Sequence, residues 1–494
     1  MNDMAAPPSP ASSAWPATSR LRDLLAALGE NLLERDEAVH LALLAALAGE
    51  HVLLIGPPGT AKSALARRLH GAFADVHYFE RLLTRFSTPE ELFGPLSLKA
   101  LEHDRYERLT EGFLPTAGIA FLDEVFKANS AILNALLTLL NERQFDNGTE
   151  RLPVPLVAVV AASNEVPTDE ALHAFYDRFL VRVPVAPVGD AAFARLLALP
   201  DDRAPAAPPA PLTAGEREAV ATAAGRVALG EAFTAACTSL RAWLAARGTG
   251  LSDRRWRQVV GLARVAAATE GRGTLDALDL WIAPYVASPS PADVPALAAW
   301  FEEHVLEAPP ATAPWLERAV AAFEKQLGIE ERMPAEGGDS AEDGAGKLAL
   351  ARAIGLARAD AGDGDGDTAT AGGGMQRIVS ERLEARLRKR WGARHVQARV
   401  GQVREIEAQV AAALAQAEAA RADLLAATQA RLWLPAPLVQ RWLGRHDAVI
   451  DLLSTFAARL QAARAGFAGL PVDEHIAGDD PAPVAYEDAD ASPA

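Results

Sequence analysis

Cysteine is nearly absent from this chain, and basic residues are outnumbered. Cys237 is the single cysteine among 494 residues, so neither an intrachain disulfide nor a cysteine-built zinc or iron–sulfur site can form within one chain. A lone thiol fits a reducing cytoplasm best. Lysine and arginine number 48 against 65 aspartate and glutamate residues, and the net charge of −17 disfavours attraction of the whole molecule to nucleic acid or anionic lipid.

Long hydrophobic runs are missing too. No apolar stretch approaches the roughly 20 residues that a membrane-spanning helix needs, and the N-terminus lacks the basic start and apolar run of a signal peptide. Half of the residues are nevertheless apolar and 23% are charged, a composition typical of a soluble globular protein. At roughly 150 residues per domain, the length predicts about three domains. The sequence therefore predicts a cytosolic protein without a membrane span.

Strand and helix patterns alternate in the first part of the chain. Residues 1–17, rich in proline, serine and alanine, predict a flexible arm. Between residues 18 and 199, short apolar runs alternate with segments of helical period, which predicts an α/β domain with a parallel sheet. Five prolines within 200–211 then predict a linker, because proline disrupts helices and central strands. The expected strands are 51–55, 76–79, 119–122, 156–162 and 180–183.

The rest of the chain has a helical pattern with one interruption. Residues 212–290 predict a small all-α domain, and 291–327 predict the first part of a further helical module. Residues 328–374 are rich in glycine and aspartate, which predicts a flexible low-complexity insertion. The module resumes over 375–470, where apolar residues recur every three or four positions, and 471–494 form an acidic tail that we expect to be solvated.

A glycine-rich loop follows the first predicted strand directly. It reads Gly56-Pro57-Pro58-Gly59-Thr60-Ala61-Lys62-Ser63 and nearly fits the phosphate-loop pattern G-x-x-x-x-G-K-[ST]. Backbone N–H groups of such a loop and of the next helix point at phosphate oxygens, Lys62 supplies positive charge to the β and γ phosphates, and the Ser63 hydroxyl ligates Mg²⁺. Ala61 stands where the pattern has glycine, which restricts the backbone there but removes no donor.

Two later strands end in polar side chains. The run 119–122 ends in Asp123 and Glu124, and the run 156–162 is followed shortly by Asn164. Ligands gather at the carboxyl ends of strands in α/β sheets. We therefore expect Asp123 to hold Mg²⁺ through water, and Glu124 to orient and polarise the water that attacks the γ phosphate. The Asn164 amide is expected to hydrogen-bond that phosphate or that water.

Taken in this order, the three features resemble those of the AAA+ ATPases. The block 118–145 resembles the MoxR clade, and the segments 83–95 and 162–165 resemble its RavA (regulatory ATPase variant) type. The resemblance covers residues 21–290. It implies a parallel-sheet nucleotide-binding core with an all-α lid, which binds ATP and Mg²⁺ and hydrolyses ATP to remodel a protein partner.

The resemblance also implies roles for two arginines. Family members form hexameric rings with ATP between subunits, so Arg178 matches an arginine finger that acts on the ATP of the neighbouring subunit. The alternative for Arg178 is a strand-edge arginine paired with an acid. Arg254 matches the sensor-2 arginine, which would reach the γ phosphate of its own subunit, with Arg255 and Arg257 as adjacent alternatives.

Two β-hairpins are predicted within the same domain. One covers 96–109, and the other covers 144–152 with a type I′ turn at Asn147-Gly148. In the family such hairpins face the pore of the ring. The alternative is an ordinary surface hairpin, because both kinds have the same sequence pattern.

Partners are implied by the resemblance as well. A protein with a von Willebrand factor A domain accompanies the family, and RavA docks on a lysine decarboxylase through a β-rich inserted domain. The insertion 328–374 has no alternating strand pattern, which argues against decarboxylase binding here. The alternative function is nucleic-acid remodelling by a predicted helix over 375–404, which holds nine basic and two acidic residues. A solvated helix face explains those charges more simply, so nucleic acid is not the expected partner.

Overall fold

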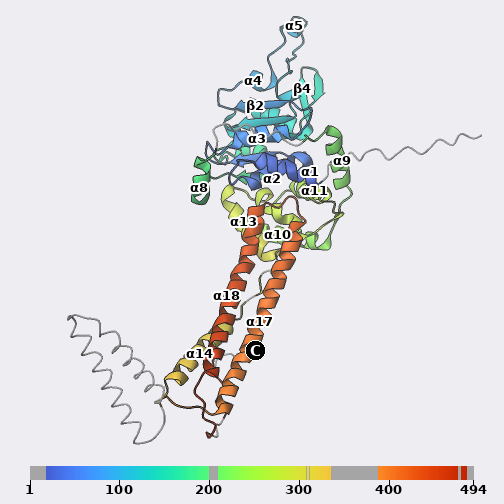
Figure 1. Cartoon of the computed structure of the whole chain (residues 1–494). Helices are drawn as coiled ribbons and strands as arrows, with labels where there is room; N and C mark the ends of the chain where they lie inside the picture. Colours follow the sequence, from blue (N-terminus) through green and yellow to red (C-terminus); the bar gives the residue numbers. More distant parts are fainter. Residues whose placement is uncertain are drawn as a thin grey trace, which may run out of the picture. The chain divides into compact units, whose positions relative to one another are not determined.

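The chain divides into two compact units. The computed structural model describes residues 18–199, 210–306, 309–310, 312–334, 388–476 and 480–486. Met1–Ala308 and Leu424–Trp442 form the first unit, and Pro309–Asp423 and Leu443–Ala494 form the second (Figure 1). The predicted arm, most of the predicted linker and most of the predicted insertion lie outside the described residues.

A five-stranded parallel sheet in the order β2-β3-β6-β1-β7 forms the centre of the first unit. The predicted parallel α/β core is thus confirmed, although β2 begins two residues later than expected. The order places β1, which leads into the glycine-rich loop, between β6 and β7. The strands are β1 Val52–Ile55, β2 Tyr78–Leu82, β3 Ile119–Asp123, β6 Ala158–Ser163 and β7 Val181–Pro184.

Both faces of this sheet are buried. Val52 and Leu54 belong to one apolar cluster and Leu53 and Ile55 to another, because successive side chains of a strand point to opposite faces. Two covered faces explain why the strands read as continuous apolar runs. Helices α1 Thr18–Gly29, α2 Asp36–Ala48 and α3 Lys62–Gly71 contribute to the first cluster, and α4 Pro89–Phe93, α6 Ser130–Glu142 and α7 Glu170–Tyr176 to the second.

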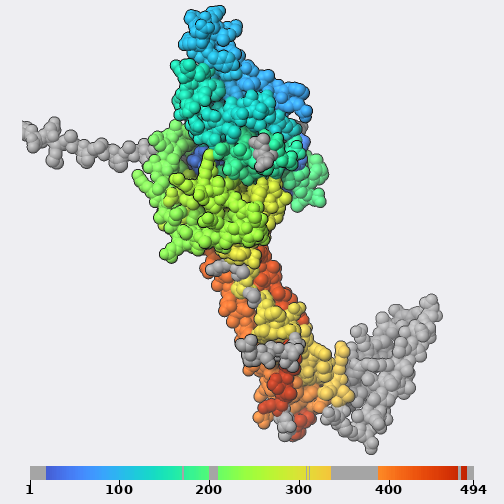
Figure 2. All heavy atoms as spheres, turned by 180° about the vertical axis from the view of Figure 1, so that it is seen from behind, coloured from blue at the N-terminus to red at the C-terminus, as the bar shows by residue number. Residues whose placement is uncertain are grey.

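The two predicted hairpins differ in outcome. Over 96–109 a short helix, α5 Leu98–Leu101, replaces the hairpin, and only Leu96 and Arg108 pair as an isolated bridge. The second hairpin is present as β4 Gln144–Asn147 and β5 Glu150–Pro153. The α5 segment projects from the first unit in both views (Figures 1 and 2).

The turn of the β4–β5 hairpin lies one residue later than predicted. Gly148 and Thr149 form the loop, and Gly148 alone has a positive φ, of 67°, so the turn is not type I′. Asn147 stays in the strand because its side-chain amide bonds both backbone groups of Arg108, donating to the carbonyl and accepting from the N–H.

A helical subdomain follows the sheet and continues past the predicted boundary at residue 290. Leu297, Trp300 and Phe301 are buried in the same cluster as Leu280 and Trp281, so the helix that carries them belongs to the first unit. Two strands of two residues each, β8 Ala228–Leu229 and β9 Thr274–Leu275, pair in a region predicted to be wholly helical. The longer helices are α9 Ala214–Ala224, α10 Glu231–Ala246, α11 Asp253–Thr269 and α13 Val294–His304.

The tip of a C-terminal helical hairpin also belongs to the first unit. The hairpin consists of α17 Ala393–Gln429 and α18 Ala436–Ala468, and its tip is the segment Leu424–Trp442. Trp433 and Trp442 are almost fully buried in the first unit's core. The prediction of one separate module over 375–470 is therefore wrong for the tip, because its apolar side chains complete a core built from residues far away in sequence.

The second unit consists of helices packed along an apolar seam. Predicted seam residues Val403, Ile406 and Val410 are buried there with Leu453 and Phe456 of α18. A third helix, α14 Pro314–Arg332, continues five residues into the predicted insertion. Among the described residues, α17 begins at Ala393, later than the expected start at residue 375.

The acidic tail, predicted to be solvated, is exposed or half-buried where it is described, and part of it packs on the second unit's core. Tyr486 stacks on Trp315 with ring centroids 5.9 Å apart, and Arg399 donates a hydrogen bond to the Ala482 carbonyl at 2.8 Å. Arg399 also donates to buried Glu330 at 2.8 Å, so one basic residue of the 375–404 segment is an internal ion-pair partner. None of the described helices combines the length and the apolar character needed to cross a membrane.

Candidate nucleotide site

Backbone geometry makes the loop after β1 suited to phosphate binding. A Cβ on Gly56 would lie 1.9 Å from the Val185 carbonyl oxygen, so only glycine fits between β1 and the segment after β7. Gly59 has a φ of 79°, which glycine adopts without strain, and nothing lies within 4 Å of where its Cβ would be. The loop therefore passes close to its neighbours on one side and stays open on the other.

Ala61 adopts the conformation for which the phosphate-loop pattern uses glycine. Its φ of 65° and ψ of 21° are left-handed, and it precedes the first residue of α3 without a side-chain cap. The first N–H groups of α3 therefore have no capping side chain, and helix N-termini with free N–H groups bind anions. Alanine in place of glycine at position 61 therefore leaves the left-handed backbone geometry of the loop unchanged.

Lys62 and Arg35 hold the loop from two sides. The Lys62 ammonium donates to the carbonyls of Gly56 at 2.6 Å and Pro57 at 2.8 Å. Burial lowers the pKa of Lys62, while Asp123 and Glu124 oppose that shift. Sequence reasoning missed Arg35, whose buried guanidinium donates to the Thr60 carbonyl at 3.1 Å and to the Ala186 carbonyl at 2.6 Å. No motif marks Arg35 in the sequence.

The predicted acidic and amide residues lie together at the carboxyl edge of the sheet. The Asn164 amide donates a short hydrogen bond to Glu124, whose other oxygen lies 3.2 Å from the Lys127 ammonium. Glu124 has a left-handed φ of 52°, and its N–H donates to the Asp123 carboxylate at 3.0 Å. β3 and β6 are neighbours, which brings Asp123, Glu124 and Asn164 to adjacent strand ends.

A cavity of about 760 Å³ opens beside the loop. Ser63 lines it together with Gly59, and most of the remaining wall is apolar. Such a wall fits a flat apolar base, since ligand cavities combine apolar surface with a few polar groups that orient the ligand. The apolar side chains come from α1, the loop after it and the segment 187–199, and they include Leu28, Leu32, Leu33, Val188 and Leu196.

Arg178 lies at the opposite edge of the sheet. β7 runs parallel to β1 with Val52 beside Val181, so the residues just before β7 lie at the amino edge, while the loop lies at the carboxyl edge. At about 3.3 Å per residue, the length of β1 places roughly 13 Å between the two edges. The Nε atom of Arg178 is buried and has no hydrogen-bond partner within the described part of the chain.

Arg254 lies at the same amino edge. The prediction placed it beside the phosphate loop of its own chain, and the structure does not bring it there. Its guanidinium donates to the Asn141 side chain at 3.0 Å. One turn later on α11, Gln258 donates at 2.8 Å to Glu50, which lies two residues before the start of β1. Burial raises the pKa of Glu50 to about 7. Burial lowers the pKa of Arg178 and the charge of Arg254 lowers it further, so the two guanidinium groups are electrostatic neighbours.

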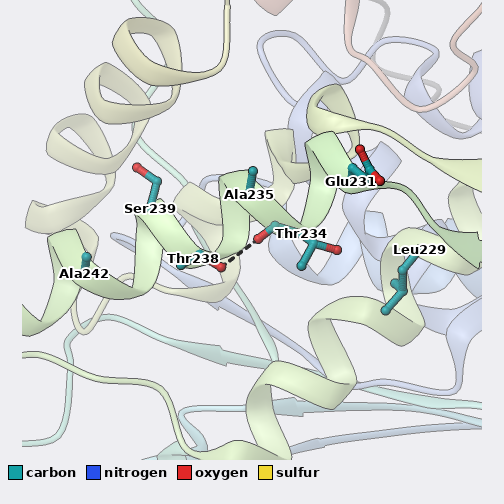
Figure 3. A pocket seen from close by; sticks show the side chains of 7 residues that line it. All are labelled: Leu229, Glu231, Thr234, Ala235, Thr238, Ser239 and Ala242. Atoms are coloured by element: carbon teal, nitrogen blue, oxygen red, sulfur yellow. Dashed lines mark hydrogen bonds between the residues drawn. The ribbon is translucent and has the colours of Figure 1, made fainter.

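A further hollow of about 720 Å³ lies along α10 in the helical subdomain (Figure 3). Its lining side chains are mostly small, and Thr238 satisfies its hydroxyl by donating to the Thr234 carbonyl at 2.9 Å. No residue of the glycine-rich loop lines it. The cavity beside the glycine-rich loop is therefore the candidate for phosphate binding.

Two known families match the chain. Residues 19–204 match the family described as the MoxR domain in the MoxR-vWA-beta-propeller ternary systems. Residues 235–301 match an AAA lid domain. The first range includes the sheet and the glycine-rich loop, and the second lies within the helical subdomain.

Individual relatives are similar over parts of their length. An uncharacterized protein of Methanocaldococcus jannaschii is 41% identical over 260 residues, which are 52% of this chain and 69% of the relative. A second uncharacterized protein of that organism is 52% identical over 164 residues, which are 33% of this chain and 43% of the relative. Protein MoxR of Paracoccus denitrificans is 30% identical over 184 residues, covering 35% of this chain and 51% of the relative. The chain thus spans about half or less of the last two proteins.

Proposed function

Because the chain belongs to the MoxR family of AAA+ ATPases, we propose that it hydrolyses Mg-ATP between subunits and uses the hydrolysis to remodel a protein partner. The observation that carries this proposal is the separation of two groups of residues. Lys62, Asp123, Glu124 and Asn164 lie at one edge of the sheet. Arg178 lies at the other edge, and its Nε atom has no hydrogen-bond partner among the described residues.

The residues at the carboxyl edge fit a magnesium nucleotide. The open N-terminus of α3 and the Lys62 ammonium provide donors for phosphate oxygens, and Ser63 and Asp123 provide oxygen ligands of the kind that Mg²⁺ takes. Bound Mg²⁺ would neutralise charge on the phosphates. Glu124 would orient the attacking water as general base, and Asn164, which already bonds Glu124, would hold that carboxylate in place.

The residues at the amino edge fit a role toward a second copy. Neither Arg178 nor Arg254 can reach the phosphate loop of its own chain across the sheet, and two neighbouring cations with an unsatisfied donor suit an anion. In a ring, this edge of one subunit would face the loop of the next. We therefore assign both arginines to the γ phosphate of a neighbour's ATP, which revises the predicted same-subunit role of Arg254.

The partner and the assembly are part of the proposal. The matched family is described from MoxR-vWA-beta-propeller systems, which supports a protein with a von Willebrand factor A domain as the partner. The RavA type, the hexameric ring and the cytoplasmic location stay predictions that rest on the sequence. A pull-down with the full chain as bait tests the partner, and recovery of no protein with such a domain would contradict it.

Mixing two inactive variants tests the division of the site between subunits. Lys62→Ala lacks the charge that faces the phosphates, and Arg178→Ala lacks the arginine proposed to act on the ATP of the neighbouring subunit. We expect each variant alone to be nearly inactive, since a trans arginine contributes roughly 10³ to 10⁵ in rate in related phosphoryl-transfer systems. Their mixture should regain ATP hydrolysis, because one interface can pair an intact loop from one variant with an intact Arg178 from the other.

The control is an exposed arginine of the helical subdomain. Arg241→Ala alters α10 away from both groups and should hydrolyse ATP like the wild type. ATP binding by each variant, measured by fluorescence titration, separates lost affinity from lost turnover. If both inactive variants assemble and exchange subunits, yet no mixing ratio exceeds the sum of their separate rates, the division of the site is disproved.

A further inference from the structure

Arg255 is buried at the junction between the helical subdomain and the sheet. Its side chain is 3% exposed. Its guanidinium donates to the carbonyls of Leu180 and Val286 at 2.8 Å each, Asp177 at 3.2 Å and Phe179 at 3.3 Å. It also donates to the Asp177 carboxylate at 3.2 Å. A single side chain from α11 thus binds the backbone directly before β7.

Three of the four carbonyls that Arg255 binds lie on the two sides of Arg178. Asp177 precedes Arg178, and Phe179 and Leu180 follow it. Arg255 is also the immediate neighbour of Arg254 on the first turn of α11, where its N–H is capped by the Ser252 hydroxyl. The buried residue therefore joins, through one set of hydrogen bonds, the two segments that carry Arg178 and Arg254.

Its neighbourhood leaves Arg255 no role in direct contact with a nucleotide. The guanidinium donates to four carbonyls and one carboxylate. These five hydrogen bonds use all five of its N–H donors. Burial lowers the pKa of Arg255 to about 10, which keeps it charged at neutral pH. A charged hydrogen-bond network with several partners fixes geometry more tightly than apolar contact would.

We propose that Arg255 is a positioning residue that holds Arg178 and Arg254 side by side at the subunit interface. This inference rests on the proposed trans role of Arg178. Through Arg255, a shift of α11 in the helical subdomain moves the backbone on both sides of Arg178 as well. The two arginines then approach or leave the neighbour's γ phosphate together, and neither moves alone.

The test uses Arg255→Lys in the full chain, because lysine keeps the buried charge but cannot span five acceptors in the fork geometry of arginine. A displacement of about 1 Å in a catalytic group costs about 10²-fold in rate, so we expect kcat to fall by about that factor. KM for ATP should not change, because the variant's own loop and cavity lie at the far edge of the sheet. Arg255→Ala should show the same pattern with a larger loss.

Mixing distinguishes positioning from a general structural role. Combined with Lys62→Ala, Arg255→Lys should regain activity above the sum of the separate rates, because its intact loop then meets intact arginines. Arg241→Ala is the matched control for loss of an arginine from the same subdomain. A wild-type kcat for Arg255→Lys, or a raised KM without rescue on mixing, would overturn the inference.

Failure of the underlying proposal would give a different result. If Arg178→Ala mixed with Lys62→Ala shows no rescue, the trans site itself is wrong, and the role of Arg255 falls with it. If that pair is rescued and the Arg255→Lys pair is not, only the positioning role is refuted.

Discussion

Ala61 sets the direction in which α3 leaves the phosphate loop. Its left-handed backbone lets the chain turn from the loop into the helix, and Ala61 and Ser63 both line the cavity. For a residue with a Cβ, the left-handed conformation costs about 1–2 kcal/mol, whereas glycine adopts it freely. The loop therefore carries a conformational cost at the residue before Lys62, where the family pattern has none.

Replacing Ala61 by glycine should stabilise the protein. Removal of the Cβ releases the left-handed strain, and the greater freedom of glycine in the unfolded chain offsets roughly 0.5–1 kcal/mol of that gain. We expect a net stabilisation of about 0.5–1 kcal/mol, measured as a shift of the urea unfolding midpoint. ATP affinity should be kept, because no donor changes.

Ala64→Gly is the matched control. Ala64 lies inside α3, where glycine costs about 1 kcal/mol relative to alanine. The two substitutions should therefore shift the midpoint in opposite directions. Equal destabilisation by both would contradict the assignment of strain to Ala61.

At the scale of elements, α11 links Arg254 and Arg255 to the hairpin tip. Its first turn carries Arg254 and Arg255, and its last residue, Thr269, accepts a hydrogen bond from the indole of Trp433 at 2.8 Å. Just beyond it, the Glu270 carboxylate accepts from the Leu432 N–H at 2.7 Å. One helix thus contacts the amino edge of the sheet at one end and the tip at the other.

Arg431 binds the tip to a buried acidic cluster. Its guanidinium pairs with Asp279 at 2.8 Å and with Asp276, and Glu270 and Asp279 are only 2% and 3% exposed. Arg431→Ala would leave Arg272 to balance both buried carboxylates. We expect a loss of about 3–5 kcal/mol, measured by denaturant unfolding followed by tryptophan fluorescence.

Arg441→Ala is the control within the same tip. Its pair with Glu302 at 3.2 Å is more than half exposed on the arginine side, so its loss should cost under about 1 kcal/mol. The Arg431→Ala deficit should also shrink at acidic pH. Burial already raises the pKa of Glu270, and losing Arg431 raises it further, so protonation then relieves the unpaired charge. Equal effects of the two substitutions would show that the tip is held by apolar packing alone.

At the scale of the whole molecule, the parallel sheet separates the phosphate loop from Arg178 and Arg254. Parallel strands place all their carboxyl ends at one edge, so the loop, Asp123, Glu124 and Asn164 gather there. The segment before β7 lies at the other edge of the same sheet. In the proposed site, one chain would therefore bind ATP but could not supply every catalytic group.

Turnover per chain should consequently rise with protein concentration and then level off. Assembly brings the amino edge of one copy to the loop of another, and mass action governs that step. ATP hydrolysis per chain is measured across dilutions, with binding of a non-hydrolysable ATP analogue measured in parallel. Binding should stay constant, because the loop and cavity belong to one chain. A turnover per chain that is independent of dilution down to concentrations where the protein is monomeric would contradict a shared site.

The phosphate loop, the strands and the acidic residues could be predicted because each is a local pattern. Residues 56–63 follow a strand directly, and Asp123 and Glu124 end another, so short-range periodicity and the rule for parallel sheets place them together. The apolar seam of α17 is equally local, since helical spacing repeats within a few residues.

Tertiary structure decided what depends on contacts between distant segments. The sequence cannot show that Arg35 braces the loop, that Arg254 lies across the sheet from it, or that Tyr486 of the acidic tail stacks on Trp315. The hairpin tip joins the first unit for the same reason. Its tryptophans have the spacing of any helical core residue, and only the packed structure determines which core they enter.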